Sequence, residues 1–183
     1  GFGGLTEYIS NRTAPKRQEQ HLANLRELVG QERYGEIWDY LQEQELFGGA
    51  YGEYTDLYFA SYALYYADEC RELLAQGEIR RSVFGRTLRE AAEGIREIDG
   101  KLAERVYTPE TEAAMNRIRE RLMELLTQEL GFEDAEVQAL LRLSRETEEL
   151  SEDEDLLERF AALGQEAAAR QGIRIAEDGE AWK

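Results

Sequence analysis

Apolar residues recur every three or four positions along most of the chain, which is the period of an α-helix. Residues 108–130 carry this spacing, and so do residues 81–106, whose apolar seam alternates steps of four and three: Phe84, Leu88, Ala91, Ile95, Ile98 and Leu102. We expect these two segments to be antiparallel neighbours across a short turn. Helical patterns also cover five further ranges: 14–29, 31–46, 53–76, 133–150 and 151–171. The spacing predicts an all-α fold, a compact bundle of six or seven mostly antiparallel helices.

Proline positions predict two of the helix starts. Pro15 and Pro109 follow Thr13 and Thr108, which are suitable N-cap residues. Proline is well tolerated in the first turn, where its missing N–H would have no partner inside the helix. We therefore expect both prolines at the beginning of a helix and neither inside one.

Residues 1–171 are predicted to form a single helical domain, followed by a flexible tail over 172–183. The β-branched trio Ile173-Arg174-Ile175 is too short to carry a sheet. Charge is distributed unevenly, because residues 108–183 hold 20 acidic and 9 basic residues, whereas residues 1–107 hold 19 and 13. A sub-boundary near 107–108 is therefore the alternative to one undivided domain.

The helix predicted over 53–76 is apolar or aromatic around most of its circumference in its first half, which is typical of a central, buried helix. Together with the seams of the other helices, it predicts a core that contains seven large side chains: Trp38, Leu57, Leu64, Ile95, Ile98, Ile118 and Leu122.

The chain is strongly acidic, with 39 Asp and Glu against 22 Lys and Arg and a net charge of −17. This charge repels phosphate backbones, so no direct nucleic-acid binding is expected. The single cysteine, Cys70, cannot form an intramolecular disulfide, and the sequence contains no Cys/His cluster for zinc and no Glu-x-x-His pair for a di-metal site. A Ser-His-Asp triad would have to use His21, which the helical pattern places on the polar side of its helix, as expected of an ordinary surface histidine. We predict no catalytic, cofactor-binding or metal-binding residues, and therefore not an enzyme.

Two stretches are candidates for binding. The acidic run from residue 146 to 155 includes a Ser151-x-x-Glu154 capping box, which explains only the first turn of the following helix. The other carboxylates favour a docking surface for a basic partner, made by Glu146, Glu148, Glu149, Glu152 and Asp153. The alternative is a ligand pocket on the tyrosine-rich helix, made by Tyr58, Tyr62, Tyr65 and Asp68. The same tyrosines would instead be core residues if their hydroxyl groups reach water or a buried partner.

The stretch from Tyr54 to Ile95 contains Tyr58-Phe59, then Glu69, then the run from Leu73 to Ile79 before a new helix. It resembles small bacterial proteins of unknown function in which a membrane anchor precedes a helical cytoplasmic domain. The resemblance implies a cytoplasmic domain tethered through a segment upstream of Gly1. The longest apolar run, Leu57–Ala67, is shorter than the roughly 20 residues of a membrane span, so we expect no span in this chain.

These observations favour a non-enzymatic helical domain that binds another protein. A second hypothesis is an acidic inhibitor or chaperone that covers a basic, nucleic-acid-binding surface by presenting carboxylates in place of phosphates. A third is a ligand-binding or enzymatic helical domain built around the tyrosines of residues 54–76.

Overall fold

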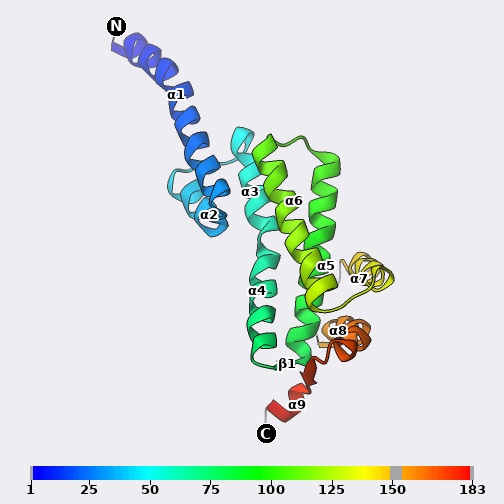
Figure 1. Cartoon of the computed structure of the whole chain (residues 1–183). Helices are drawn as coiled ribbons and strands as arrows, with labels where there is room; N and C mark the ends of the chain where they lie inside the picture. Colours follow the sequence, from blue (N-terminus) through cyan, green and yellow to red (C-terminus); the bar gives the residue numbers. More distant parts are fainter. Residues whose placement is uncertain (1, 149–153, 182–183) are drawn as a thin grey trace. The chain divides into compact units, whose positions relative to one another are not determined.

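The computed structural model describes the backbone of residues 2–148 and 154–181 and the side chains of residues 15–148 and 154–179 (Figure 1). The predicted all-α class is confirmed. The chain divides into two compact units. Unit 1 contains Gly1–Phe59 and Tyr107–Ala114, and unit 2 contains Ala60–Val106 and Met115–Lys183. One division point lies beside the predicted 107–108 boundary, whereas the prediction of a single domain over 1–171 stays a prediction.

Unit 1 is built from the first helices of the chain and the beginning of a later one: α1 (Phe2–Gly30), α2 (Tyr34–Glu43), the 3-10 turn η1 (Gly49–Tyr51), α3 (Gly52–Ala60) and the first residues of α6 (Pro109–Glu124). Helices α1 and α2 pack against each other. The buried apolar side chains of this unit are Leu25, Val29, Tyr34, Ile37, Leu41, Tyr54, Leu57, Tyr107 and Ala114.

Helix α1 ends at Gly30, as predicted, and α2 follows after a tight turn. The turn is closed by a backbone bond from the N–H of Arg33 to the carbonyl of Leu28 (2.9 Å), with Glu32 in the left-handed region (φ 57°). The predicted start of this helix near Pro15 is wrong, because Pro15 lies inside α1. A proline removes one helical hydrogen bond, and the helix continues on both sides of it. The prediction for Pro109 is confirmed, because α6 begins there.

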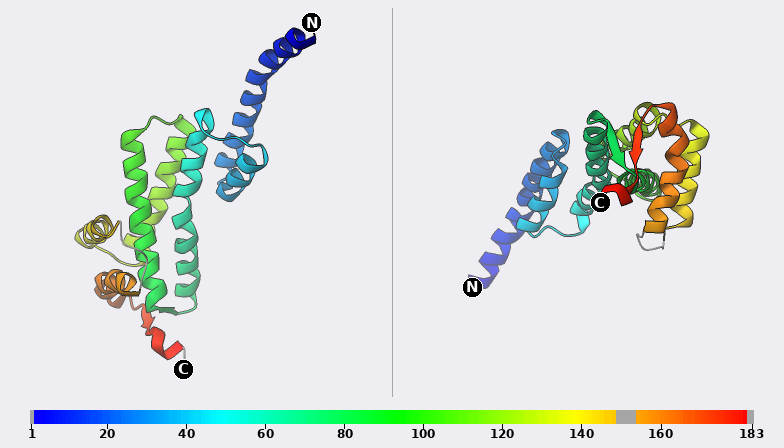
Figure 2. Two further views of the ribbon diagram at one scale, coloured as in Figure 1. Left: turned by 180° about the vertical axis from the view of Figure 1, so that it is seen from behind. Right: turned by 90° about the horizontal axis from the view of Figure 1, so that it is seen from below.

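Unit 2 contains the remaining elements in chain order: α4 (Tyr62–Ala75), β1 (Glu78–Arg80), α5 (Arg81–Glu104), the rest of α6, the π-helical turn η2 (Leu125–Glu129), α7 (Asp134–Glu146), α8 (Glu154–Arg170), β2 (Arg174–Ala176) and α9 (Asp178–Ala181). Helix α5 is the central element, because α4, α7 and α8 all pack against it (Figure 2). Its seam is buried as predicted at Phe84, Leu88, Ala91, Ile95 and Ile98.

Glycines allow two of these helices to approach α5 closely. A Cβ atom on Gly85 would lie 2.2 Å from the backbone oxygen of Leu157 in α8. A Cβ atom on Gly94 would lie 2.9 Å from the Cβ of Ala63 in α4 and 3.0 Å from a methyl group of Leu122 in α6. The absence of a side chain at these two positions therefore sets the distance between α5 and its neighbours.

Helices α5 and α6 run antiparallel within unit 2, as predicted. Asp99 near the end of α5 pairs with Arg119 (2.7 Å), and Gly94, further back along α5, faces Leu122, further along α6. The contacts move in opposite directions along the two helices, which is the arrangement of an αα-hairpin.

The predicted helix over 53–76 is interrupted. Helix α3 ends at Ala60 and α4 begins at Tyr62, with Ser61 buried between them. Ser61 keeps near-helical torsion angles (φ −73°, ψ −13°) and makes no capping hydrogen bond with its side chain, so the break is slight, and a hydrophobic pattern cannot show it. Of the seven predicted core residues, six are buried and Trp38 is only half-buried.

The segment after α6 is π-helical and not α-helical, which corrects the predicted helix to residue 130. The N–H of Leu130 bonds to the carbonyl of Leu125 (2.8 Å), five residues back. This longer repeat stacks Leu130 over Leu125, and both are fully buried. In an α-helix Glu129 would instead lie over Leu125, so the π-helical turn keeps a carboxylate out of the core.

Strands β1 and β2 pair in parallel, with Ile79 opposite Ile175 (Figure 2). Residues 174–176, which the sequence placed in a flexible tail, are therefore hydrogen-bonded to residues 78–80. The prediction missed this pairing because it depends on a partner strand almost a hundred residues earlier. Ile79 is buried, so the short ladder also covers part of the core of unit 2.

Candidate functional site

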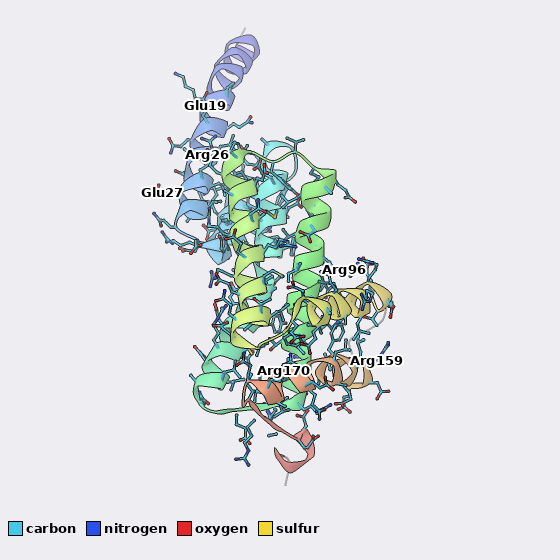
Figure 3. All side chains as sticks on the ribbon, turned by 45° about the vertical axis from the view of Figure 1, so that its right-hand side comes forward. Glu19, Arg26, Glu27, Arg96, Arg159 and Arg170 are labelled. Atoms are coloured by element: carbon cyan, nitrogen blue, oxygen red, sulfur yellow. The ribbon has the colours of Figure 1, made fainter. Side chains whose placement is uncertain are left out.

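The predicted acidic docking surface is only partly within the described residues: Glu149, Glu152 and Asp153 lie outside them. Glu146 is the last residue of α7 and is exposed. The carboxylate of Glu148 pairs with the guanidinium of Arg96 (3.1 Å), which also donates to the hydroxyl of Ser144 (3.0 Å), and Figure 3 shows Arg96 beside α7. Glu148 therefore has an intramolecular partner that the sequence did not reveal.

Glu154 and Asp155, the last two residues of the acidic run, line a cleft of unit 2 with a volume of about 670 Å³. We call it the acidic cleft, and its walls come from the start of α5, the start of α8 and the segment after β2: Arg81, Ser82, Arg86, Glu154, Asp155, Leu157, Glu158, Glu177, Asp178 and Gly179. Five carboxylates and two guanidinium groups line it, so its net charge is negative.

One wall is fixed by Arg81. Its Nε donates to both carboxylate oxygens of Glu158 (2.9 and 2.7 Å), and its Nη1 donates to Gln165 (3.1 Å). These hydrogen bonds, together with the charge of Arg81, lower the pKa of Glu158, which stays ionised at neutral pH. The fork geometry of the guanidinium holds α8 against the start of α5.

The opposite wall is fixed by Asp178. Its carboxylate accepts a hydrogen bond from the backbone N–H of Ser82 (3.1 Å) in the first turn of α5. Such N–H groups have no partner within the helix, and a carboxylate also interacts favourably with the positive end of the helix dipole. The parallel β1–β2 pairing places Asp178 at this point, because it brings the chain back to the start of α5.

Three further carboxylates of the acidic cleft differ from these two. Within the described residues, Glu154 and Asp155 make no side-chain hydrogen bond or ion pair. Glu177 makes none within hydrogen-bonding distance, although its charge acts on the guanidinium of Arg81. Glu154 and Asp155 lie in the first turn of α8, where the helix dipole stabilises them. Their carboxylate oxygens remain accessible, so they can accept hydrogen bonds from a cation outside the chain.

A smaller cavity of about 280 Å³ shares Ser82, Arg86 and Asp178 with the acidic cleft. Its other lining residues come from α4, the end of β1 and the start of α5: Tyr66, Glu69, Arg80, Val83 and Thr87. Two guanidinium groups face two carboxylates here, so this cavity lacks the negative excess of the acidic cleft.

The four residues of the predicted tyrosine pocket are distributed over both units. Tyr58 belongs to unit 1 and stacks on Trp38, with ring centroids 5.0 Å apart. Tyr62 and Tyr65 belong to unit 2, with 46% and 56% of their surface exposed and ring centroids 6.1 Å apart. None of the four lines either of the two described cavities. The hypothesis that they bind a ligand stays a prediction.

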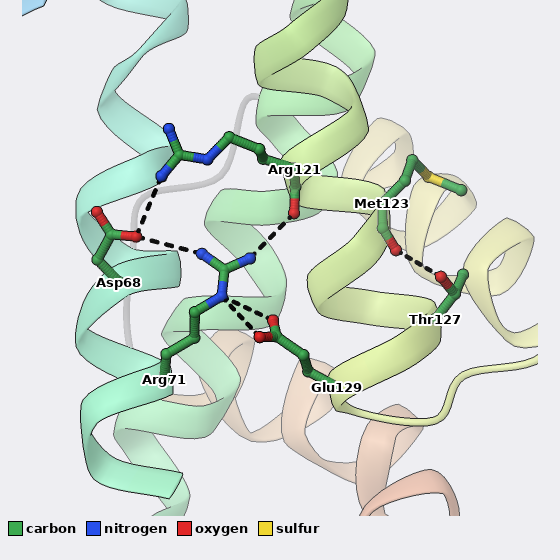
Figure 4. A network of polar contacts seen from close by, with 6 residues as sticks. All are labelled: Asp68, Arg71, Arg121, Met123, Thr127 and Glu129. Atoms are coloured by element: carbon green, nitrogen blue, oxygen red, sulfur yellow. Dashed lines mark hydrogen bonds and ion pairs between the residues drawn. The ribbon is translucent and has the colours of Figure 1, made fainter. Parts of the chain in front are cut away.

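Asp68, the fourth residue of that pocket, belongs to a polar network between α4 and α6 (Figure 4). Arg71 is its centre: it donates to Glu129 (2.8 Å), to Asp68 (3.2 Å) and to the backbone carbonyl of Arg121 (3.3 Å). The network anchors the π-helical turn to α4, because Glu129 is its last residue. This gives Asp68 and Arg71 a structural role.

His21 and Cys70 line neither of the two described cavities. His21 is half-buried, and its Nδ1 lies 2.7 Å from the hydroxyl of Tyr40, which also accepts from Asn24 (2.9 Å). Cys70 is fully buried, and burial raises the pKa of its thiol to about 11. In the part of the chain that the structure describes, no three His, Cys, Asp or Glu side chains come together as metal ligands, and no helix is long and apolar enough to cross a bilayer.

Comparison of the chain with models of known protein families, with characterised proteins and with solved structures finds no match. Functional inference therefore depends on the residues of this chain.

Proposed function

We propose that the protein is a non-enzymatic helical domain that binds a basic protein partner, and that the acidic cleft of unit 2 receives Lys or Arg side chains of this partner. The observation that supports the proposal is the set of accessible carboxylates on the cleft walls: Glu154, Asp155 and Glu177. Carboxylates grouped in a concave site attract cations more strongly than the same charges on a flat surface, because the walls exclude part of the screening water.

The proposed site extends the predicted acidic docking surface by two residues that line the cleft, Glu154 and Asp155. These two residues directly follow the acidic run of residues 146–153 in sequence. Direct binding of nucleic acid is disfavoured by the same charge. The acidic-inhibitor hypothesis is the version of this proposal in which the partner's basic surface also binds nucleic acid. A reducing, cytoplasmic location is part of the proposal, because a lone buried thiol suits such a compartment.

A lysine-rich peptide is the probe that tests the cleft. We would measure its affinity for the full chain at several salt concentrations, and again after Glu154→Gln with Asp155→Asn. The double variant loses two ion pairs between the peptide and the cleft. Its affinity for the peptide should therefore be about 3- to 10-fold weaker at low salt, and should depend less on the salt concentration.

The matched control is Glu110→Gln with Glu112→Gln. These two exposed residues occupy the first turn of α6, so the control removes the same charge and the same dipole interaction away from the cleft. The control should bind the peptide nearly as well as the unaltered chain. Equal weakening by both double variants would show that the peptide senses only net charge, and the cleft would then not be the site.

A further inference from the structure

The smaller cavity of unit 2, with a volume of about 280 Å³, differs from the acidic cleft in its size and in its charges. Its walls come from α4, the end of β1, the start of α5 and Asp178 after β2, so all of its lining residues belong to one unit. Binding sites for small molecules have volumes of about 300–1,000 Å³, so this cavity suits a ligand at the small end of that range.

Four charged side chains line the smaller cavity, and two of them already have partners. The carboxylate of Asp178 accepts a hydrogen bond from the backbone N–H of Ser82 (3.1 Å), and Arg86 interacts with other residues of the chain. Within the described residues, Glu69 and Arg80 make no side-chain hydrogen bond or ion pair. These two groups have opposite charges and line the same cavity, but they do not pair with each other.

The backbone positions Glu69 and Arg80 on different walls. Glu69 lies on α4, one turn after Tyr66, which also lines the cavity. Its charge acts on the buried thiol of Cys70, the next residue, without forming an ion pair. Arg80 is the last residue of β1 and has an extended backbone (φ −70°, ψ 146°). Because side chains alternate along a strand, Arg80 lies on the side of β1 opposite the buried Ile79.

We propose that the smaller cavity binds a free amino acid with an apolar side chain, whose carboxylate pairs with Arg80 and whose ammonium group pairs with Glu69. A zwitterion supplies both charges on neighbouring atoms, so it satisfies both walls at once. A simple anion or cation would leave one wall unpaired and would be repelled by the group of like charge.

The rest of the lining indicates which side chain the amino acid carries. Tyr66 and Val83 are half-buried, and both offer apolar surface to the cavity. The adjoining acidic cleft disfavours an acidic side chain by charge repulsion. Leucine is therefore a suitable probe. This inference goes beyond the proposed function and is independent of it, because Glu154, Asp155 and Glu177 do not line the smaller cavity.

Three related probes separate the two charges of the ligand. We would measure the affinity of the full chain for leucine, for leucine amide, which lacks the carboxylate, and for N-acetyl-leucine, which lacks the ammonium group. Isothermal titration calorimetry gives each affinity directly. Leucine should bind, and each of the other two probes should bind about 3- to 10-fold more weakly, because each loses one of the two ion pairs.

Two variants assign the charges to their residues. Arg80→Gln should weaken binding of leucine by about 3- to 10-fold but should not weaken binding of leucine amide. Glu69→Gln should have the same effect on leucine and should not weaken binding of N-acetyl-leucine. The matched controls are Arg142→Gln in α7 and Glu72→Gln in α4. Both control residues are exposed and make no side-chain hydrogen bond or ion pair among the described residues, and neither lines the cavity.

Three outcomes would overturn the proposal: no binding of leucine, equal affinity for the three probes, or equal weakening by the variants and their controls. Circular dichroism would show that the helices of each variant are intact. The Glu154→Gln/Asp155→Asn double variant should bind leucine as tightly as the unaltered chain. Loss of lysine-peptide binding in that double variant concerns the acidic cleft alone, so the two proposals can fail separately.

Discussion

Replacement of Gly85 by alanine is the sharpest test of the packing in unit 2. The added Cβ would lie 2.2 Å from the backbone oxygen and 2.9 Å from the carbonyl carbon of Leu157. A flexible side chain could move away, but these atoms belong to the backbone of α8. Helix α8 would have to shift as a whole, and the hydrogen bonds from the Nε of Arg81 to the two carboxylate oxygens of Glu158 would be strained with it.

The expected magnitude combines two opposing effects. Overpacking of a core costs about 1–3 kcal/mol, and a backbone obstacle favours the upper end of this range. Alanine in place of glycine within a helix contributes about 1 kcal/mol in the other direction. We expect Gly85→Ala to lower the free energy of unfolding by about 2 kcal/mol. Gly100 in the same helix has no atom within 4 Å of its Cβ position, so Gly100→Ala should raise stability by up to about 1 kcal/mol.

Urea unfolding followed by far-ultraviolet circular dichroism measures both variants. The midpoint should move to lower urea for Gly85→Ala and to higher urea for Gly100→Ala, with an unchanged slope. If the two variants shifted the midpoint in the same direction, the close approach of α5 and α8 would be refuted. The two variants can be compared directly, because each replaces a glycine by alanine in the same helix.

Two further predictions concern the end of α7 and the buried thiol. Glu146→Gln should raise the free energy of unfolding by about 0.3 kcal/mol, because the helix dipole disfavours an anion at the last residue. Glu148→Gln should lower it by up to about 1 kcal/mol, because the pair with Arg96 is lost, and equal shifts of the two urea midpoints would contradict that pair. At pH 8 Cys70 should react slowly with a disulfide reagent in the folded protein and rapidly in urea, because burial raises the pKa of its thiol. Rapid labelling of the folded chain would contradict the burial.

Periodicity was sufficient to predict most of the helices, because each helix buries a continuous stripe. The seam of α5 and its antiparallel pairing with α6 were predictable in this way. The π-helical turn was not, because the apolar spacing of residues 118–125 continues an α-helical pattern, and only the fold shows that Leu130 is buried with Leu125 while Glu129 reaches Arg71, 58 residues earlier. Glycine has a low helix propensity, but in the fold Gly85 and Gly94 are the positions where neighbouring helices approach α5.

The acidic cleft was predictable only in part. The run of carboxylates before α8 was visible in the sequence, and Glu154 and Asp155 belong to it. The opposite wall was not visible, since Glu177 and Asp178 reach α5 only through the β1–β2 pairing. A signal was present in the β-branched residues around Arg174, but a three-residue strand is too short to recognise without its partner.

Net charge alone does not locate a binding surface on this protein, because many of its carboxylates stabilise the fold. Among the described residues, arginine side chains join neighbouring elements through carboxylates in ion pairs that include Arg71–Glu129, Arg81–Glu158, Arg96–Glu148, Arg119–Asp99, Arg121–Asp68 and Arg170–Glu136. A partner that binds one of these carboxylates must compete with an arginine that is already in place. The carboxylates that make no such contact are therefore the better guide, and Glu154, Asp155 and Glu177 meet in one cleft. On this reasoning, a basic partner would bind where intramolecular pairing ends and not where acidic residues are most numerous.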